Sequence, residues 1–298
     1  MKHALAGAVE RWKIFFTMRH HIFALSIALV SIMLSARATR GWPGWKTFIL
    51  VPTGVFLLKV CCASYKHIVH LRTKKSLTSS PSPGSLETDN ARAGAWFFLL
   101  TGAFGFVVCC GIANSLCLFI SPFLLAAVCF YPHFQRMSDY STLYPGVIHA
   151  LLPLWAWIAA TGSIRWEPFA LGIIALFWAG GLATLESIRT LDSDHANGRH
   201  SLPISWGTKN ALSFAFLLHL LTVMAMAVFS FFALLKIAYL VSVGFITLCV
   251  LIEHWIAKIR KQHWLGDAFF RLNLVVSIVF TVAFACEMAF PFFNFSVR

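Results

Sequence analysis

The sequence predicts an all-α integral membrane protein, built as a bundle of nine transmembrane helices. Its 298 residues are 59% hydrophobic and only 12% charged, with a mean hydropathy of +0.76. Soluble domains carry about 25% charged residues, so a chain with half that share, 29 Phe and 11 Trp requires a lipid environment. Nine apolar stretches each approach the length of about 20 residues that a helix needs to cross a bilayer.

The nine stretches follow one another along a single domain that covers residues 1–298. The apolar run that starts at residue 211 is too long for one crossing, and Lys236 is its one full charge, so we divide it near residues 230–236. A Ser/Pro/Gly-rich stretch, SLTSSPSPGS, interrupts the chain after the second stretch. We expect helices at 20–38, 47–65, 94–113, 115–131, 144–162, 167–187, 211–230, 235–255 and 270–291.

The distribution of positive charge predicts that the N-terminus is cytoplasmic and the C-terminus is outside. With this orientation most of the 24 Lys and Arg residues fall on the inner side, as they do in most membrane proteins. The net charge of +13 therefore does not indicate nucleic-acid binding, because basic patches with interleaved aromatic residues do not occur outside these loops. The N-terminal segment lacks a small-residue cleavage site after a short apolar core, so we expect no cleaved signal peptide.

The polar segment between the sixth and seventh stretches is the first candidate site. It places Asp192 and Asp194 two residues apart, followed by Gly198 and Arg199, in a chain with only 11 acidic residues. In an extended or turned segment both carboxylates could reach one cation, and Arg199 adds a planar donor group suited to phosphate. Mg²⁺ is usually held by one or two carboxylates together with phosphate oxygens. The alternative is a solvated loop with a helix cap.

Basic residues in two other inner segments are candidates for binding an anion. Arg136 follows the fourth stretch and is either a second phosphate clamp or an anchor at the membrane surface. Lys66, Arg72 and Lys74 follow the second stretch, with no acidic residue before Glu87. They either neutralise an anionic substrate or attract anionic lipid headgroups.

Ionisable residues inside the apolar stretches generally face the interior of a bundle. Glu186 ends the sixth stretch beside the acidic segment, so we expect it in the wall of the site. Glu253 and His254 lie together near the end of the eighth stretch, whereas we expect His219 to be a core residue whose polar atoms are satisfied. The eight Cys residues fall mostly in apolar runs without C-x-x-C spacing, which favours buried hydrophobic positions over a metal site.

The acidic segment resembles the loop after the sixth span of the UbiA-type intramembrane prenyltransferases, which reads roughly D-x-x-x-D-x-x-x-G-x-x-S-[IL]-P. In this register the chain matches at Asp194, Gly198, Ser201, Leu202 and Pro203.

A second segment, residues 131–138, is similar to the family's Y-x-x-x-K-R-x-T, with Gln135, Arg136 and Ser138 in the K, R and T positions. The likeness covers most of residues 20–290 and is specific between 131 and 204. The branch it resembles prenylates aromatic acids in ubiquinone or menaquinone synthesis.

This resemblance implies a nine-helix bundle of UbiA type in the inner (plasma) membrane, with its active-site loops on the cytoplasmic side. The implied reaction begins with Mg²⁺-assisted departure of diphosphate from a polyprenyl diphosphate. An aromatic acid acceptor similar to 4-hydroxybenzoate then attacks the allylic cation. It implies Asp192 and Asp194 as the catalytic, metal-binding residues and Arg136 as a diphosphate-binding residue. From their charge and position alone, we add Arg199, Lys66, Arg72 and Lys74 to the diphosphate-binding set.

The chain departs from the family pattern at three places. The family's first acidic loop, about N-D-x-x-D-x-x-x-D, corresponds here to residues 63–75, which contain no carboxylate. Thr190 replaces the first Asp of the second loop, and Gln135 replaces the Lys. We therefore expect one Mg²⁺ ion rather than two, with the basic residues binding diphosphate directly. The alternative is an impaired family member that binds or presents isoprenoid or quinone without turnover.

Overall fold

The computed structural model describes residues 21–77, 85–259 and 262–289. Within them, nine helices are long and apolar enough to cross a membrane, and strands are absent, so the prediction of a nine-helix membrane protein is confirmed. The described elements are α2 (His21–Thr39), α3 (Gly44–Leu77), α4 (Ser85–Ala113), α5 (Ser115–Met137), η2 (Asp139–Leu143), α6 (Tyr144–Thr161), α7 (Glu167–Arg189), α8 (Leu191–Ala196), α9 (Leu202–Phe232), α10 (Ile237–Ile259) and α11 (Gln262–Ala289).

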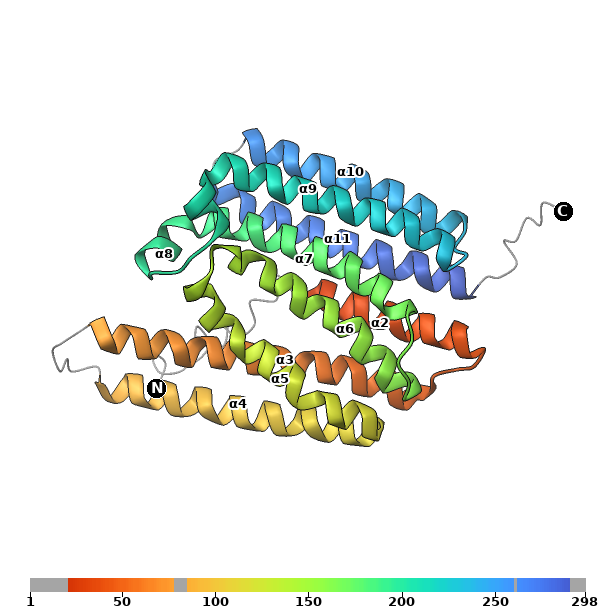
Figure 1. Cartoon of the computed structure of the whole chain (residues 1–298), viewed down its shortest axis with the longest axis horizontal. Coiled ribbons are helices and arrows are strands. Elements are labelled where there is room, and N and C mark those ends of the chain that lie inside the picture. Colours follow the sequence, from red (N-terminus) through yellow and green to blue (C-terminus); the bar gives the residue numbers. More distant parts are fainter. Residues whose placement is uncertain (1–20, 78–84, 260–261, 290–298) are drawn as a thin grey trace, which may run out of the picture.

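The long helices lie side by side in one bundle (Figure 1). Helices α3, α4 and α5 form one side, and α9, α10 and α11 form the other, with α2, α6 and α7 between them. The last helix, α11, packs against α2, so the end of the described chain returns to its beginning. The short helix α8 lies at one end of the bundle, between α7 and α9 (Figure 1).

The bundle is apolar on its lipid-facing surface as well as in its core. Trp157 and Trp178 are the largest fully buried side chains, while Phe104, Phe119 and Phe231 are among many large apolar side chains on the outside. Such an exposed apolar surface would be a liability in water. It suits a helical membrane protein, whose backbone polar groups are all satisfied within each helix.

Several helices extend beyond the predicted spans where they meet the polar end of the bundle, and α3 and α9 show why. Helix α3 continues to Leu77, because residues 55–77 contain neither Gly nor Pro to end it. The basic residues Lys66, Arg72 and Lys74 therefore lie on a helix instead of a loop. Helix α9 begins at Leu202, ahead of its apolar run, because Pro203 fits the first turn of a helix; Gly207, with φ 78° and ψ 157°, then breaks it locally.

Helices α6 and α7 approach each other closely at glycine positions. A Cβ atom on Gly146 would lie 2.4 Å from the carbonyl oxygen of Leu176, and one on Gly172 would lie 2.9 Å from that of Ala150. Small residues of this kind allow backbones to pack closely in membranes, where van der Waals contact drives helix association.

We predict that Gly146→Ala destabilises the bundle by about 1–3 kcal/mol, the usual cost of overpacking, because backbone rather than a movable side chain blocks the new methyl group. The measurement is thermal unfolding of the purified protein in detergent. Gly94→Ala on α4 is the matched control, since a Cβ there meets nothing within 4 Å. Equal melting temperatures for the two variants would contradict the assigned packing.

Candidate functional site

The segment between α7 and α9 folds into a compact turn that carries the acidic residues. Helix α7 ends at Arg189, and only Thr190 separates it from the six residues of α8. Gly198 then adopts φ 60°, a left-handed conformation that glycine reaches without steric cost, and the chain reverses into α9 at Ser201. We expected an extended or turned segment; a helical turn forms instead.

The carboxylate of Asp194 is buried and held on both sides. Its Oδ2 accepts a hydrogen bond from the Thr190 hydroxyl at 2.6 Å, and its Oδ1 pairs with Arg199 Nη1 at 3.0 Å. The backbone N–H of Arg199 also donates to the Asp194 carbonyl at 2.9 Å. A buried charge is costly unless it is paired and hydrogen-bonded, and Asp194, with 7% of its surface exposed, meets both conditions.

Asp192 is exposed, in contrast to Asp194. Both lie on α8, where residues two apart point about 200° away from each other. Their carboxylates therefore do not converge on one position in this conformation. A joint role of the two residues in holding a metal ion stays a prediction.

Hydrogen bonds join the turn around α8 to the last turn of α5 and to the connection between α5 and α6. The backbone N–H of His200 donates to the Gln135 carbonyl at 2.8 Å, and the Ser141 hydroxyl donates to the His200 carbonyl. The His200 ring nitrogen Nδ1 lies 3.0 Å from the Asp139 carboxylate. The structure thus joins the two segments on which the sequence resemblance was most specific.

A Lys and a Tyr from two further helices complete this end of the bundle. Lys66 Nζ on α3 lies 5.7 Å from the centre of the Tyr131 ring on α5, within cation–π range. Gln135 Nε2 donates to the Tyr131 hydroxyl at 2.9 Å. Lys66 and Tyr131 are each within electrostatic range of Asp194, Glu186 and Arg199. Helices α3, α5, α7 and α8 therefore bring charged groups and a tyrosine to one place.

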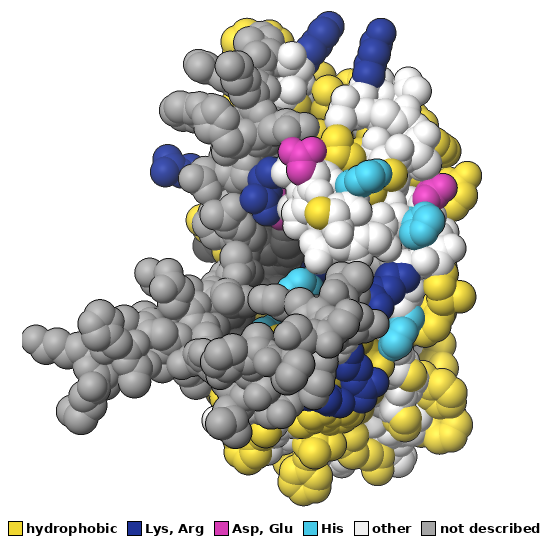
Figure 2. Space-filling model, turned by 90° about the vertical axis from the view of Figure 1, so that its left-hand side faces the viewer, with side chains coloured by type: hydrophobic (Ala, Val, Ile, Leu, Met, Phe, Trp, Pro, Cys, Tyr) yellow, Lys and Arg dark blue, Asp and Glu magenta, His cyan; other side chains and the backbone are white. Residues whose placement is uncertain are grey.

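The remaining predicted residues lie around this cluster. Glu186, in the last turn of α7, is partly buried and forms an ion pair with Arg189. Arg72 on α3 and Arg136 on α5 are exposed, and the Lys74 side chain lies outside the described part of the structure. Figure 2 views this end of the bundle: charged and histidine side chains gather there, whereas hydrophobic side chains cover the flanks.

The carboxylate of Asp194 has the chemistry to bind a divalent cation such as Mg²⁺. Each oxygen of Asp194 has one protein partner, which leaves further lone pairs for a cation, and diphosphate oxygens would supply the other ligands. The facing helix α3 presents Lys66 and no carboxylate between residues 63 and 75. A second ion would therefore lack protein ligands on that side.

Sequence reasoning missed the roles of Thr190 and Tyr131. Thr190 was noted only as the replacement for an expected Asp, but its hydroxyl orients Asp194. The spacing of four residues along a helical path was the signal that could have found this contact. The pairing of Tyr131 with Lys66 joins residues 65 positions apart and gave no local signal.

Known proteins resemble this chain over much of its length. Residues 88–275 match the model of the UbiA prenyltransferase family. The chain is 26% identical over 189 residues to the protoheme IX farnesyltransferase of Thioalkalivibrio sulfidiphilus, a match that covers 61% of each protein. It is 29% identical over 117 residues to the protoheme IX farnesyltransferase of Cutibacterium acnes, covering 39% of this chain and 31% of that one. The chain thus matches under two thirds of the length of both relatives.

Two solved structures have a similar fold. The apo structure of a UbiA homologue from Aeropyrum pernix K1 superposes with a TM-score of 0.74 at 24% identity, over 91% of this chain and 98% of that one. A UbiA homologue from Archaeoglobus fulgidus bound to DMAPP and Mg²⁺ gives a TM-score of 0.64 at 13% identity, with the same coverage. At these identities the likeness shows the fold alone.

We predict that Ser141→Ala loosens the turn around α8, because it removes a hydroxyl that fastens the turn to the α5–α6 connection. Loss of one hydrogen bond costs about 1 kcal/mol, so amide hydrogens of residues 191–200 should exchange several-fold faster. Hydrogen-exchange mass spectrometry measures this. Ser213→Ala is the control, since that hydroxyl bonds only within α9. Unchanged exchange in the Ser141 variant would contradict the assigned docking.

Proposed function

The chain belongs to the UbiA prenyltransferase family, and from that premise we propose that it transfers an isoprenoid group from a polyprenyl diphosphate to an acceptor within the membrane. The observation that carries the proposal is the charged cluster at one end of an apolar bundle. There Lys66 is within electrostatic range of Glu186, Asp194 and Arg199, and Asp194 forms an ion pair with Arg199. An isoprenoid diphosphate has the matching form, with a charged head and an apolar chain.

We propose that basic side chains bind the diphosphate head. Lys66 and Arg199 belong to the cluster, and Arg72 and Arg136 lie on the helices that lead to it. Charge-assisted hydrogen bonds from such groups to phosphate oxygens are stronger than neutral ones, and the planar guanidinium can make two at once. Lys66 stands where the family pattern has an acidic loop, so this chain would bind diphosphate directly on α3.

The residues fit one Mg²⁺ ion, which we propose is held by Asp194 together with diphosphate oxygens. When bound, the ion would offset the negative charge of the leaving diphosphate. Arg199 and Thr190 orient the carboxylate for this role. The contribution of Asp192 as a further ligand requires α8 to rearrange.

In the proposed reaction the allylic C–O bond breaks and its electron pair leaves with the diphosphate. Basic side chains that are already in place stabilise the departing charge better than water would, because they need no reorganisation. With an aromatic acceptor, a carbon–carbon bond then forms between the allylic cation and the ring, and the ring loses a proton from the carbon that is attacked. The apolar helices exclude water that would otherwise quench the cation.

Two classes of acceptor follow from different observations. The resemblance at residues 131–204 favours an aromatic acid similar to 4-hydroxybenzoate, as used in quinone synthesis. The two named relatives, by contrast, are protoheme IX farnesyltransferases. We propose that the protein lies in the inner (plasma) membrane with its α8 end on the cytoplasmic side, since the basic residues around the cluster suit that side.

One observation favours a second function, a protein that binds or presents isoprenoid without turnover. Residues 63–75 lack the carboxylates of the family's first loop, and Asp194 is already engaged by Thr190 and Arg199. The deciding experiment incubates purified protein with labelled polyprenyl diphosphate, with and without Mg²⁺. Hydroxylated aromatic acids and protoheme IX are supplied as separate acceptors. A prenylated product identifies the acceptor; tight binding of unchanged diphosphate in every arm supports the binding function.

We predict that Asp194→Asn lowers the rate of diphosphate release by about a hundredfold or more, the usual cost of losing one charge-stabilising group. The change removes a charge but little volume. Release of labelled diphosphate in saturating Mg²⁺ measures the effect. Glu167→Gln, at the other end of α7, is the control for loss of a carboxylate. Full activity of the Asp194 variant would rule out its role with the metal.

We predict that Lys66→Gln combined with Arg72→Gln weakens binding of a polyprenyl diphosphate by at least tenfold, because both cations are assigned to its head group. Binding is measured in detergent without Mg²⁺, so that any metal-mediated contact is absent. Lys46→Gln, near the opposite end of α3, provides the control. If the double variant binds as tightly as the wild type, α3 does not contact the diphosphate.

A further inference from the structure

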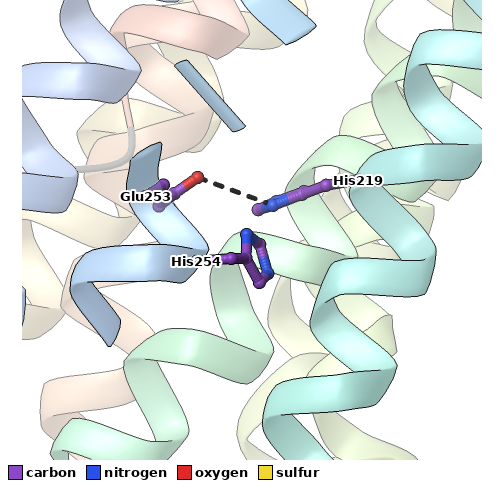
Figure 3. A group of neighbouring side chains, drawn as sticks. All are labelled: His219, Glu253 and His254. Carbon is purple, nitrogen blue, oxygen red and sulfur yellow. Dashed lines mark ion pairs between the residues drawn. The ribbon is translucent and has the colours of Figure 1, made fainter. Parts of the chain in front are cut away.

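Three ionisable side chains meet inside the bundle, between α9 and α10. His219 extends from α9 toward Glu253 and His254, which are neighbours on α10 (Figure 3). Each offers one nitrogen or carboxylate oxygen, and these atoms lie within 4.8 Å of one another. The exposed fractions are 0% for His219, 2% for Glu253 and 9% for His254. Three such groups seldom share an apolar interior without a function.

Four polar atoms of this trio have no hydrogen-bond partner among the described residues: both ring nitrogens of His219, Oε1 of Glu253 and Nε2 of His254. His219 Nδ1 and Glu253 Oε2 lie 3.5 Å apart, which is too long for an ordinary hydrogen bond. His219 is therefore a core residue, as expected, but the expectation that its ring nitrogens are hydrogen-bonded is wrong. Buried polar atoms are nearly always partnered, so this arrangement requires an explanation.

The imidazole of His254 is oriented as metal-bound histidines usually are. Its Nδ1 lies 3.1 Å from the backbone carbonyl of Val250, to which it donates in the neutral tautomer. The opposite nitrogen, Nε2, then carries a free lone pair and is buried without a hydrogen-bond partner among the described residues. Metal-ligating histidines typically donate their second N–H to a carbonyl or carboxylate in this way.

Packing fixes the imidazole of His219. The ring stacks on Trp178 of α7 with centroids 4.8 Å apart, and Trp178 Nε1 donates to Asn273 at 3.0 Å. A Cβ atom on Gly181 would lie 2.4 Å from the imidazole, so only glycine leaves room for it there. The ligand atoms are thus held on rigid helices, as a preorganised metal site requires.

We propose that His219, Glu253 and His254 bind one divalent transition-metal ion, with zinc as the representative. Two imidazoles and one carboxylate are a common ligand set for zinc and for non-haem iron, while Mg²⁺ prefers oxygen ligands. Zinc bonds of about 2.0–2.2 Å place ligand atoms about 3.4 Å apart in a tetrahedron, so small side-chain rotations close the trio around an ion. Three protein ligands leave one coordination position open.

This site is separate from the proposed diphosphate site. Trp178, which stacks on His219, precedes Glu186 by eight residues of α7, which is about 12 Å of helix rise. The two sites also differ in chemistry, because one offers nitrogen ligands in an apolar interior and the other offers carboxylate and basic groups at the polar end. The metal site therefore does not depend on the proposed transferase activity.

The test uses the full chain, purified in detergent with a histidine-free tag and stripped with a chelator. Zinc is titrated in excess Mg²⁺, and bound metal and melting temperature are measured. We expect one tightly bound zinc per chain and a higher melting temperature, because a ligand that binds only the folded state stabilises it. Glu253→Gln and His219→Asn should bind at least tenfold more weakly. His149→Gln, a buried histidine on α6, should bind like the wild type.

X-ray absorption spectroscopy of the zinc-loaded wild type tests the ligands without any substitution. Two imidazole nitrogens and a carboxylate oxygen at about 2.0–2.2 Å would support the site. A zinc ion without imidazole, or wild-type binding no tighter than that of the Glu253 variant, would overturn it and leave a proton-sharing His–Glu pair. Asp194→Asn should keep zinc binding, so loss of transferase activity and loss of this site are distinguishable.

Discussion

The ion pair between the buried carboxylate of Asp194 and Arg199 determines how the polar end of this bundle is built. A charge at the edge of a membrane interior must be neutralised by its surroundings. The turn at Gly198 brings Arg199 back to Asp194, and Thr190 supplies the second contact. The same turn carries His200 to the α5–α6 connection. The pair therefore fixes the loop and, with it, the position of the groups that surround it.

The positive charge on α3 distinguishes this chain from the family pattern, which has carboxylates at this place. Where that pattern has carboxylates, this helix carries Lys66, which is attracted to Asp194 and Glu186. A cation fixed in the protein can replace a bound metal ion opposite an anionic substrate, since both offset the same negative charge. In the proposed reaction this exchange removes the need for a second ion and makes binding of the diphosphate less dependent on metal. The positive charge of Lys66 also helps to neutralise the buried carboxylate of Asp194.

The lengths of the apolar segments predicted much of the fold, but they did not predict the contacts between helices. Sequence reasoning identified the segments that carry Asp194, Arg136 and Glu186, because polar residues are rare and therefore conspicuous in an apolar chain. It did not show that α8 turns Asp192 away from Asp194, since two carboxylates close in sequence point differently on a helix and on a loop. Nor did it show that the nitrogens of His219 lack partners, because Glu253 and His254 come from another helix.

The sequence by itself determined the nine-helix membrane architecture, the polar segments between the helices and the loss of acidic residues on α3. Those properties depend on composition and local order, and transfer of apolar residues into lipid dominates the free energy of each helix. Only the tertiary structure decided which side chains meet, as Lys66 does with Tyr131 and His219 with Glu253. These side-chain contacts depend on the rotation of each helix about its axis and on the residue at which it ends. Packing against neighbouring helices fixes both.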